Sequence, residues 1–310
     1  MVSKKINLKN NWLDFSILFL IVIINLFWLP TFSYWKIYPK NSFLTKNNYL
    51  LNFNSPDTPV IKLADNPILN TDTYILIDVA TNKILTSKNI DRKIYPASTT
   101  KLATAITALN LYPLDEIVTV DQTYEEGKIM ELQLGEKITI KSLVQALLVY
   151  SANDSAFTLA THYQGGLSGF VSQMNSLMSK YNLNDTHFVN VDGIHSDDHY
   201  STVYDLSQLG RLAIKNPIVR DVVKNQNLTI TDVSGQIKHE ITSTNELLST
   251  TPEIIGLKTG WTPEAKGCFI GLISLGGHEV ISVVANSDDR FQDTETLLNW
   301  LKQNVFWQSN

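Results

Sequence analysis

The sequence predicts an α+β fold in which one sheet is covered by helices. Strand patterns stand near both ends of the region that follows residue 72, as TYILIDV and KILTSKN near residue 80 and as further stretches after residue 226. Between them, apolar residues recur at the helical spacing of three to four positions. Because strands enclose a helical middle, we expect the two ends of this region to meet in one sheet.

The expected elements follow one another in this order. TYILIDV, a turn at 80–82 and KILTSKN form a hairpin of strands. Helices are expected over 99–109, 141–149, 154–163, 168–180 and 204–214. Strands return over 227–232, 236–242, 254–258, 268–275 and 279–286, and a last helix covers 292–306.

Composition indicates a folded protein. Of the 310 residues, 44% are hydrophobic and 18% are charged, which excludes a disordered or highly charged chain. The 25 basic and 30 acidic residues give a net charge of -5, so no positive field attracts nucleic acid and none is expected as a partner. The one cysteine, Cys268, excludes an intramolecular disulfide and a cysteine-built zinc site.

A long apolar run lies near the N-terminus. FSILFLIVIINLFWL occupies 15–29, and residues 12–35 are enough to cross a hydrocarbon core of ~30 Å. Lys4, Lys5 and Lys9 precede the run, which favours a cytoplasmic N-terminus, although further lysines follow it. No small-x-small cleavage site comes after the run, so an uncleaved membrane anchor is favoured over a cleaved signal peptide and a secreted protein.

These features divide the chain into four parts. Residues 36–69 are rich in Asn, Pro, Asp, Thr and Lys without a sustained period, which is typical of a linker. We therefore expect a cytoplasmic tail over 1–11, a transmembrane anchor over 12–35, a linker over 36–69 and one domain over 70–310, outside the cytoplasm.

The first of three short motifs is S-x-x-K, from Ser98 to Lys101. The extended YPA before it and the apolar TTKLATAITAL after it place Ser98 at a helix N-terminus, with Lys101 on the same face. A desolvated lysine there loses its proton more easily and can accept the proton of a serine hydroxyl. The alternative is a capping serine beside a solvated lysine, and 33–36 is a second S-x-x-K.

The second motif, Ser151-Ala152-Asn153, is expected on a loop between two helices. A hydroxyl and an amide at such a place can relay a proton and hold a substrate amide. Two other S-x-N triplets occur, at 87–89 and 243–245, and a helix-capping serine is the ordinary alternative.

The third motif, Lys258-Thr259-Gly260, is the only K-T-G in the chain and ends the apolar run EIIGL. On a strand edge it offers a cation and a hydroxyl to an anionic group, and Gly260 lets substrate backbone approach closely. The alternative is an edge lysine that discourages aggregation.

Order and context make the three motifs more informative together. Their first residues are 53 and 107 positions apart, in the order found in penicillin-binding proteins and class A β-lactamases. Their expected positions also agree with this set: the first motif starts a helix, the second lies on a loop between helices, and the third lies on a late strand. The combination therefore indicates one active site that uses all three.

From about Asp72 to Trp300 the chain resembles the D-alanyl-D-alanine carboxypeptidases, a family of low-molecular-mass penicillin-binding proteins. Longer blocks carry the resemblance: YPASTTKLATAITAL, SANDSAFTLA, DGIHSDDHYSTVYDLSQLGRLA, TNELL and GLKTGWTPEA. It implies a β-lactamase/transpeptidase-like α+β fold, with an antiparallel sheet flanked by helices and a helical subdomain, preceded here by one N-terminal transmembrane helix. Many relatives continue into a small β-domain and a C-terminal anchor, so anchoring is expected at the N-terminal run.

The resemblance also implies a serine-type carboxypeptidase that removes the terminal D-alanine from peptidoglycan stem peptides through an acyl-enzyme. β-Lactam antibiotics would acylate the same serine, and no cofactor or metal is expected. An oxyanion hole is implied at the backbone N–H groups of Ser98 and Trp261. The implied catalytic residues are Ser98, Lys101 and Ser151, and the implied substrate-binding residues are Asn153, Lys258, Thr259, Gly260 and Trp261.

Several other functions use similar residues. A D,D-endopeptidase that cuts peptide cross-links needs the same set, so it stays open. A class A β-lactamase adds a glutamate for deacylation, and the glutamates between 155 and 258 stand only late, at Glu240, Glu246 and Glu253. A penicillin sensor needs a cytoplasmic effector, for which about 11 residues before the apolar run are too few.

A metal site is a further alternative at a cluster of polar residues. His195, Asp197, Asp198 and His199 lie in a glycine-containing loop without the helical spacing of an H-E-x-x-H site, so loop hydrogen bonding is favoured. Cys268 lies in the apolar stretch CFIGLISL, which indicates a buried, inert thiol.

Overall fold

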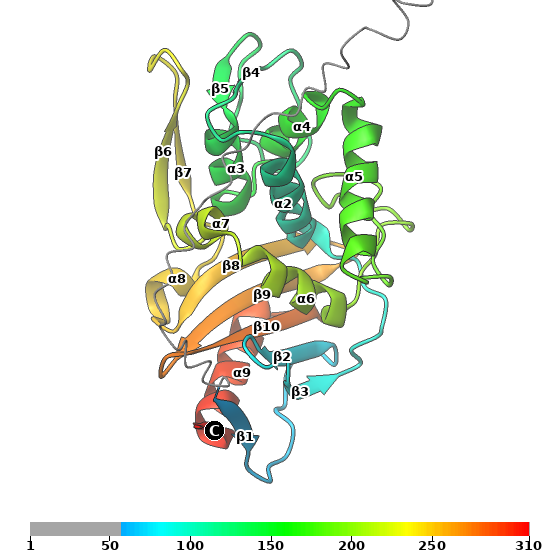
Figure 1. Ribbon diagram of the computed structural model, residues 1–310, viewed down its shortest axis with the longest axis vertical. Coiled ribbons are helices and arrows are strands. Elements are labelled where there is room, and N and C mark those ends of the chain that lie inside the picture. Colours follow the sequence, from blue (N-terminus) through cyan, green and yellow to red (C-terminus); the bar gives the residue numbers. More distant parts are fainter. Residues whose placement is uncertain (1–56, 310) are drawn as a thin grey trace, which may run out of the picture. The chain divides into compact units, whose positions relative to one another are not determined.

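A five-stranded antiparallel sheet forms the centre of the computed structural model, which describes residues 57–309 (Figure 1). Its strand order is β3 (Ile84–Lys88), β2 (Tyr74–Asp78), β10 (His278–Ser287), β9 (Lys266–Leu275) and β8 (Ile254–Thr262). The early strand β2 pairs with the late strand β10, with Ile77 opposite Ile281. The expectation that two distant parts of the chain meet in one sheet is therefore confirmed.

Helices cover both faces of this sheet (Figure 1). On one face α6 (Val203–Ala213) packs against β2, β9 and β10, and on the other α9 (Arg290–Asn304) packs against β9 and β10. The alternation of side chains along β2 explains both contacts. Ile75 and Ile77 belong to the core on the α6 side, whereas Tyr74 and Leu76 pack with Leu297 and its neighbours on α9.

A group of helices stands beyond α6 and carries the residues between the early and late strands (Figure 1). Apolar side chains at helical spacing bury the inner faces of these helices in the larger core. Four helices of this group agree closely with the expected ranges, and a 3-10 turn, η1 (Ala97–Thr100), precedes the first of them. They are α2 (Lys101–Leu111), α3 (Ile140–Val149), α4 (Asn153–Thr161) and α5 (Gly166–Lys180). Two short helices, α7 (Pro217–Val222) and α8 (Leu247–Thr250), were not expected, and Leu247 of α8 belongs to the smaller core on the α9 side.

Three short antiparallel pairs complete the described residues. The pair β6 (Asn227–Thr231) and β7 (Lys238–Thr242) is a hairpin formed by the two strands expected over 227–232 and 236–242. The pair β4 (Ile117–Thr119) and β5 (Lys137–Thr139) was not expected. The third pair joins β1 (Thr58–Ile61) to β11 (Val305–Gln308), two segments far apart in the sequence.

This third pair corrects two expectations. Residues 58–61 were expected in a linker, yet they form a strand whose Val60 lies opposite Phe306. The last helix was expected to reach 306, but α9 ends at Asn304 and the chain continues as β11. Both elements are too short to show a period in sequence, and each is formed because the other pairs with it.

The expected tail over 1–11, the anchor over 12–35 and the linker up to residue 56 lie outside the described residues. Within 57–309, no helix has both the length and the apolar character needed to cross a membrane.

Candidate active site

The first motif forms a tight turn at the start of α2. Ser98 lies in η1, and α2 begins at Lys101, so one turn separates the two side chains. The Lys101 Nζ donates a hydrogen bond to the Ser98 Oγ at 2.8 Å. Ala97 holds a positive φ of 47° just before the serine, a conformation that costs free energy in a non-glycine residue and is typical of functional turns.

Burial changes the acidity of Lys101. Its side chain has no exposed surface, and its Nζ also donates to the Asp192 carbonyl oxygen at 2.6 Å. Desolvation lowers the pKa of Lys101 to about 8, although the carboxylates of Asp192 and Asp154 act against the shift. The neutral amine, which can accept a proton, is therefore accessible close to neutral pH.

The second serine has its own buried lysine. Ser151 lies between α3 and α4 with a positive φ of 69°, and its Oγ accepts a hydrogen bond from the Lys258 Nζ at 2.9 Å. The same Nζ donates to the Thr259 carbonyl oxygen at 2.9 Å. Burial, with repulsion from Lys101 and other cations, holds the pKa of Lys258 well below its usual value. Each motif serine thus sits beside a desolvated amine.

Asn153 differs from the expectation that it lies on a loop. It is the first residue of α4, and its side chain is engaged. The Nδ2 group donates to the Glu126 carbonyl oxygen at 2.8 Å, and the backbone N–H donates to the Lys128 carbonyl oxygen at 2.7 Å. A Cβ at Gly127 would lie 2.5 Å from this Nδ2, so the close approach requires glycine. Asn153 therefore fixes the loop over 126–128.

The third motif lies in β8, which is an edge strand of the sheet. Gly260 passes directly beside the nucleophile turn, because a Cβ at this position would lie 2.8 Å from the Ser98 backbone nitrogen. Thr259 donates its hydroxyl proton to Thr244 Oγ1 at 2.7 Å. Trp261 follows with 60% of its surface exposed. β8 continues to Thr262, beyond the expected end at 258, because it pairs with β9 along the whole motif.

The block after residue 191 also lies against the nucleophile turn. The Asp192 carbonyl oxygen accepts from Lys101, and Gly193 lies so close to the nucleophile turn that a Cβ there would overlap the Ala97 carbonyl group. Tyr124 donates to the Asp192 Oδ2 at 2.8 Å and stacks on Phe157. The structure therefore brings all three predicted motifs to one place and adds residues that the motifs alone did not indicate.

Sequence comparison is in agreement with this arrangement. A sequence model of the peptidase S11 family, described as D-alanyl-D-alanine carboxypeptidase, matches residues 61–289. The chain belongs to the peptidase S11 family.

Several proteins are similar to this chain in sequence, and one solved structure is similar to it in fold. D-alanyl-D-alanine carboxypeptidase DacD of Salmonella typhimurium is 32% identical over 256 residues, which are 77% of this chain and 64% of the relative. The D-alanyl-D-alanine carboxypeptidase of a Streptomyces species is 33% identical over 71% of this chain and 83% of its own length. The crystal structure of the Streptomyces K15 DD-transpeptidase matches with a TM-score of 0.72 and 31% identity, covering 76% of this chain and 98% of that chain. The S11 chain thus has the transpeptidase, or penicillin-binding protein, fold.

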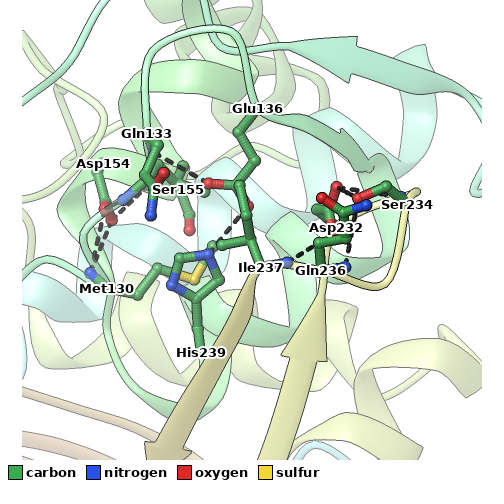
Figure 2. Close-up of polar contacts among 11 residues, drawn as sticks. Met130, Gln133, Glu136, Asp154, Ser155, Asp232, Ser234, Gln236, Ile237 and His239 are labelled. Atoms are coloured by element: carbon green, nitrogen blue, oxygen red, sulfur yellow. Dashed lines mark hydrogen bonds and ion pairs between the residues drawn. The ribbon is translucent and has the colours of Figure 1, made fainter.

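Asp154 is a further residue of this S11 peptidase site that the motifs did not indicate. It follows Asn153, is buried, and its carboxylate accepts backbone hydrogen bonds from Met130 at 3.1 Å and from Leu132 at 3.0 Å. Figure 2 draws it in one view with Glu136, whose carboxylate lies 2.9 Å from the His239 Nε2 on β7. Since the partners of Asp154 are backbone donors, no residue pattern reveals the contact in advance.

The polar cluster at 195–199, the alternative metal site of the sequence analysis, includes a histidine that is hydrogen-bonded within the protein. The Nδ1 of His199 accepts from the Val189 N–H at 3.2 Å, so its Nε2 carries the proton and donates to Thr100 Oγ1 at 2.8 Å. Burial lowers the pKa of His199 to about 3, which keeps the ring neutral. Residues 57–309 contain no group of three or more His, Cys, Asp and Glu side chains placed to hold a metal ion.

Cys268 is fully buried in β9, as the sequence predicted. Its Sγ donates to the Tyr95 carbonyl oxygen at 3.4 Å, and burial raises the pKa of the thiol to about 11. A thiol that stays protonated is a weak nucleophile, so Cys268 contributes packing beneath the segment that leads to Ser98.

Proposed function

We propose that this S11 chain is a serine-type carboxypeptidase that removes the terminal D-alanine from peptidoglycan stem peptides. The observation that carries the proposal is the hydrogen bond from Lys101 Nζ to Ser98 Oγ, made by an amine whose pKa burial lowers to about 8. The family supports the substrate class. The match spans 64% of the length of the DacD relatives, so the activity is proposed for the domain that the chain contains.

The first step is attack on the carbonyl between the two D-alanines. Neutral Lys101 accepts the hydroxyl proton as the Ser98 oxygen forms the ester bond. The negative charge on the carbonyl oxygen is held by the backbone N–H groups of Ser98 and Trp261. Support for this pairing comes from Gly260, which keeps β8 within contact distance of the Ser98 backbone.

The second step is departure of D-alanine and hydrolysis of the ester. The Ser151 hydroxyl donates its proton to the leaving amine and accepts a proton from Lys258, whose Nζ is hydrogen-bonded to the Ser151 Oγ. Lys101 then passes the proton that it took from Ser98 to the neutral Lys258 and becomes a base again. Water attacks the acyl carbonyl and loses a proton to Lys101, which returns that proton to the Ser98 oxygen as the ester bond breaks. Asn153 is proposed to hold the substrate amide, which requires it to share or exchange its present contact with Glu126.

The terminal carboxylate is proposed to bind at Lys258 and Thr259, beside the edge of β8. An arriving carboxylate favours the charged form of Lys258, whose pKa burial otherwise lowers. Arg290 is a further candidate cation. Its side chain contacts Gly267, which pairs with Trp261 of β8. The buried Nε of Arg290 has no hydrogen-bond partner among residues 57–309.

We also propose a single-pass membrane protein, with residues 12–35 as its anchor and the catalytic domain outside the cytoplasm. The apolar run and the lysines before it support this placement. Mass spectrometry of the mature N-terminus in the native host tests it. A start near residue 36 would show a cleaved signal peptide and a secreted enzyme instead.

The activity is tested with the full chain in detergent. A pentapeptide ending in D-Ala-D-Ala and a cross-linked peptide dimer are supplied separately, and released D-alanine and cleaved dimer are quantified. Release of D-alanine by the wild type and its loss in Ser98→Ala are expected. Cleavage of the dimer without action on the pentapeptide would replace the proposal with a D,D-endopeptidase.

A further inference from the structure

Tyr124 differs from its neighbours in the loop between β4 and β5. Residues 121–123 and 125–128 are exposed, whereas Tyr124 is partly buried. Its ring stacks on Phe157 of α4, with the ring centroids 4.9 Å apart and the planes inclined by 24°. Tyr124 is therefore the side chain of this stretch that packs against the rest of the protein.

The Tyr124 hydroxyl is directed at a buried carboxylate. It donates to the Asp192 Oδ2 at 2.8 Å, while the Glu126 Oε2 lies farther away, at 3.5 Å. Asp192 has 3% of its surface exposed, and its other oxygen, Oδ1, accepts from the Ile194 N–H at 3.2 Å. Burial and the two carboxylates raise the pKa of Tyr124, so the phenol stays protonated and remains a donor.

The main-chain carbonyl of Asp192 faces the nucleophile and its base. The Lys101 Nζ donates to this oxygen at 2.6 Å, and the Ser98 Oγ lies 3.4 Å from it. The next residue, Gly193, lies directly against the Ala97 carbonyl group. Because the Lys101 amine bridges this oxygen and the serine hydroxyl, the position of the Asp192 backbone determines where the amine lies relative to Ser98.

The loop connects the second motif to this backbone. Asn153, the first residue of α4, holds the loop over 126–128 by two hydrogen bonds. Phe157, four positions later on the same helix, supports the Tyr124 ring. The tyrosine hydroxyl then continues the connection to Asp192, so one unbroken series of contacts runs from α4 to the carbonyl that receives the catalytic amine.

We propose that Tyr124 is a positioning residue for acylation: its hydroxyl holds Asp192 so that the Asp192 carbonyl keeps the Lys101 Nζ on the Ser98 Oγ. This inference rests on the proposed function, in which Ser98 is the nucleophile and Lys101 its base. Without the hydroxyl, a buried carboxylate loses one of its donors and Asp192 relaxes with its backbone. Since displacement of reacting groups by about 1 Å lowers a rate up to about 100-fold, the chemical step is affected and binding is not.

The test measures acylation by a fluorescent penicillin with the full chain in detergent. Stopped-flow rates over a range of penicillin concentrations give the limiting acylation rate and the apparent Kd separately. Tyr124→Phe is compared with the wild type and with Tyr112→Phe, the matched control, whose partly buried hydroxyl donates to the Leu159 carbonyl oxygen of α4 at 3.1 Å. Tyr124→Phe is also combined with Asp192→Ala, which removes the carboxylate and keeps the main-chain carbonyl. All rates are taken at about pH 9.5, where Lys101 is mostly neutral and a change in its pKa has little effect.

Tyr124→Phe is expected to lower the limiting rate about 10-fold and to change the apparent Kd less than about twofold. Tyr112→Phe should change neither, and Tyr124→Phe should have no further effect once Asp192→Ala is present, because the two act on one contact. An unchanged limiting rate in Tyr124→Phe, a change in Kd alone, or an undiminished effect beside Asp192→Ala would overturn the inference. Failure of the proposed function looks different, because then the wild type is not labelled at Ser98.

Discussion

Lys101 and Ser98 are joined by a hydrogen bond of 2.8 Å between Nζ and Oγ, and the lysine side chain is entirely buried. Two forces act on this amine. Desolvation disfavours its charge, whereas nearby carboxylates favour it, and desolvation is the larger, so the pKa falls to about 8. The pair therefore places the Ser98 hydroxyl beside an amine that can be neutral, and so act as a base, close to neutral pH.

The pH dependence of acylation follows from this pKa. Below about pH 8 Lys101 is mostly protonated and cannot accept the hydroxyl proton, so the rate of Ser98 acylation by a fluorescent penicillin should rise with pH and reach half its maximum near pH 8. Lys101→Met should lower the rate about 1,000-fold or more. Stopped-flow labelling from pH 6 to 9.5, with circular dichroism to confirm folding, gives the profile. A rate independent of pH would contradict the role of Lys101.

Gly193→Ala should disrupt the nucleophile turn. The glycine has a φ of 85°, and an added Cβ would overlap the Ala97 carbonyl group and lie 2.9 Å from the Ser98 nitrogen. A displacement of the serine by about 1 Å is enough to lower acylation about 100-fold. Gly235→Ala is the matched control, because its φ of 75° imposes similar backbone strain in open space. Equal acylation rates in the two variants would contradict the claim that the contact of Gly193 with Ala97 positions Ser98.

Asp154→Asn should loosen the loop that Asn153 and Asp154 hold. The carboxylate accepts from the backbone N–H groups of Met130 and Leu132, and an amide can accept fewer of these bonds. We expect a loss of about 1–3 kcal/mol in the free energy of unfolding and a higher KM for peptide. Chemical denaturation and steady-state kinetics measure both. The exposed Asp121→Asn should change neither, and an unaltered KM in Asp154→Asn would contradict a link between the loop and substrate binding.

The pH dependence of the free energy of unfolding provides a second test of Asp154. Burial raises its pKa, so the folded protein binds this proton more tightly than the unfolded chain. Its contribution to stability is therefore fully present at low pH and decreases as pH rises from the usual carboxyl value through the raised one. Asp154→Asn should remove that decrease. Unfolding curves across this acidic range compare the two slopes, and parallel slopes would contradict the raised pKa.

Glu136→Gln should detach the β6–β7 hairpin from the loop before β5. The Glu136 side chain has no exposed surface and His239 only 7%, and the carboxylate also accepts from the Gln133 N–H at 2.9 Å (Figure 2). Leaving a buried donor unpaired costs about 1–3 kcal/mol. Hydrogen exchange over 227–242 should rise in this variant and stay unchanged in Glu240→Gln on the exposed side of β7. Exchange that rises equally in both would show that the buried pair is dispensable.

Much of this architecture could be predicted from local pattern. The order of the S-x-x-K, S-x-N and K-T-G motifs placed Ser98, Ser151 and Lys258 correctly on a turn, a loop and a late strand, because each motif carries its own flanking signal. The pairing of β1 with β11 could not be predicted, since neither strand is amphipathic over a useful length and each depends on the other.

The site contacts that the sequence could not predict have one physical reason in common. Asn153 and Asp154 bind backbone groups of residues more than twenty positions away, and the Asp192 carbonyl that receives Lys101 is itself a backbone atom. Backbone donors and acceptors are the same for every residue type. Only the folded chain therefore reveals which of them complete the site.

The central claim is that Ser98 carries the acyl group. The full chain is mixed with a pentapeptide ending in D-Ala-D-Ala, quenched in acid within milliseconds to seconds, digested and mapped by mass spectrometry. We predict a tetrapeptidyl ester on the peptide that contains Ser98, with release of D-alanine, and no such ester in Ser98→Ala. D-alanine release without any ester at Ser98, or an ester at Ser151 instead, would contradict the account.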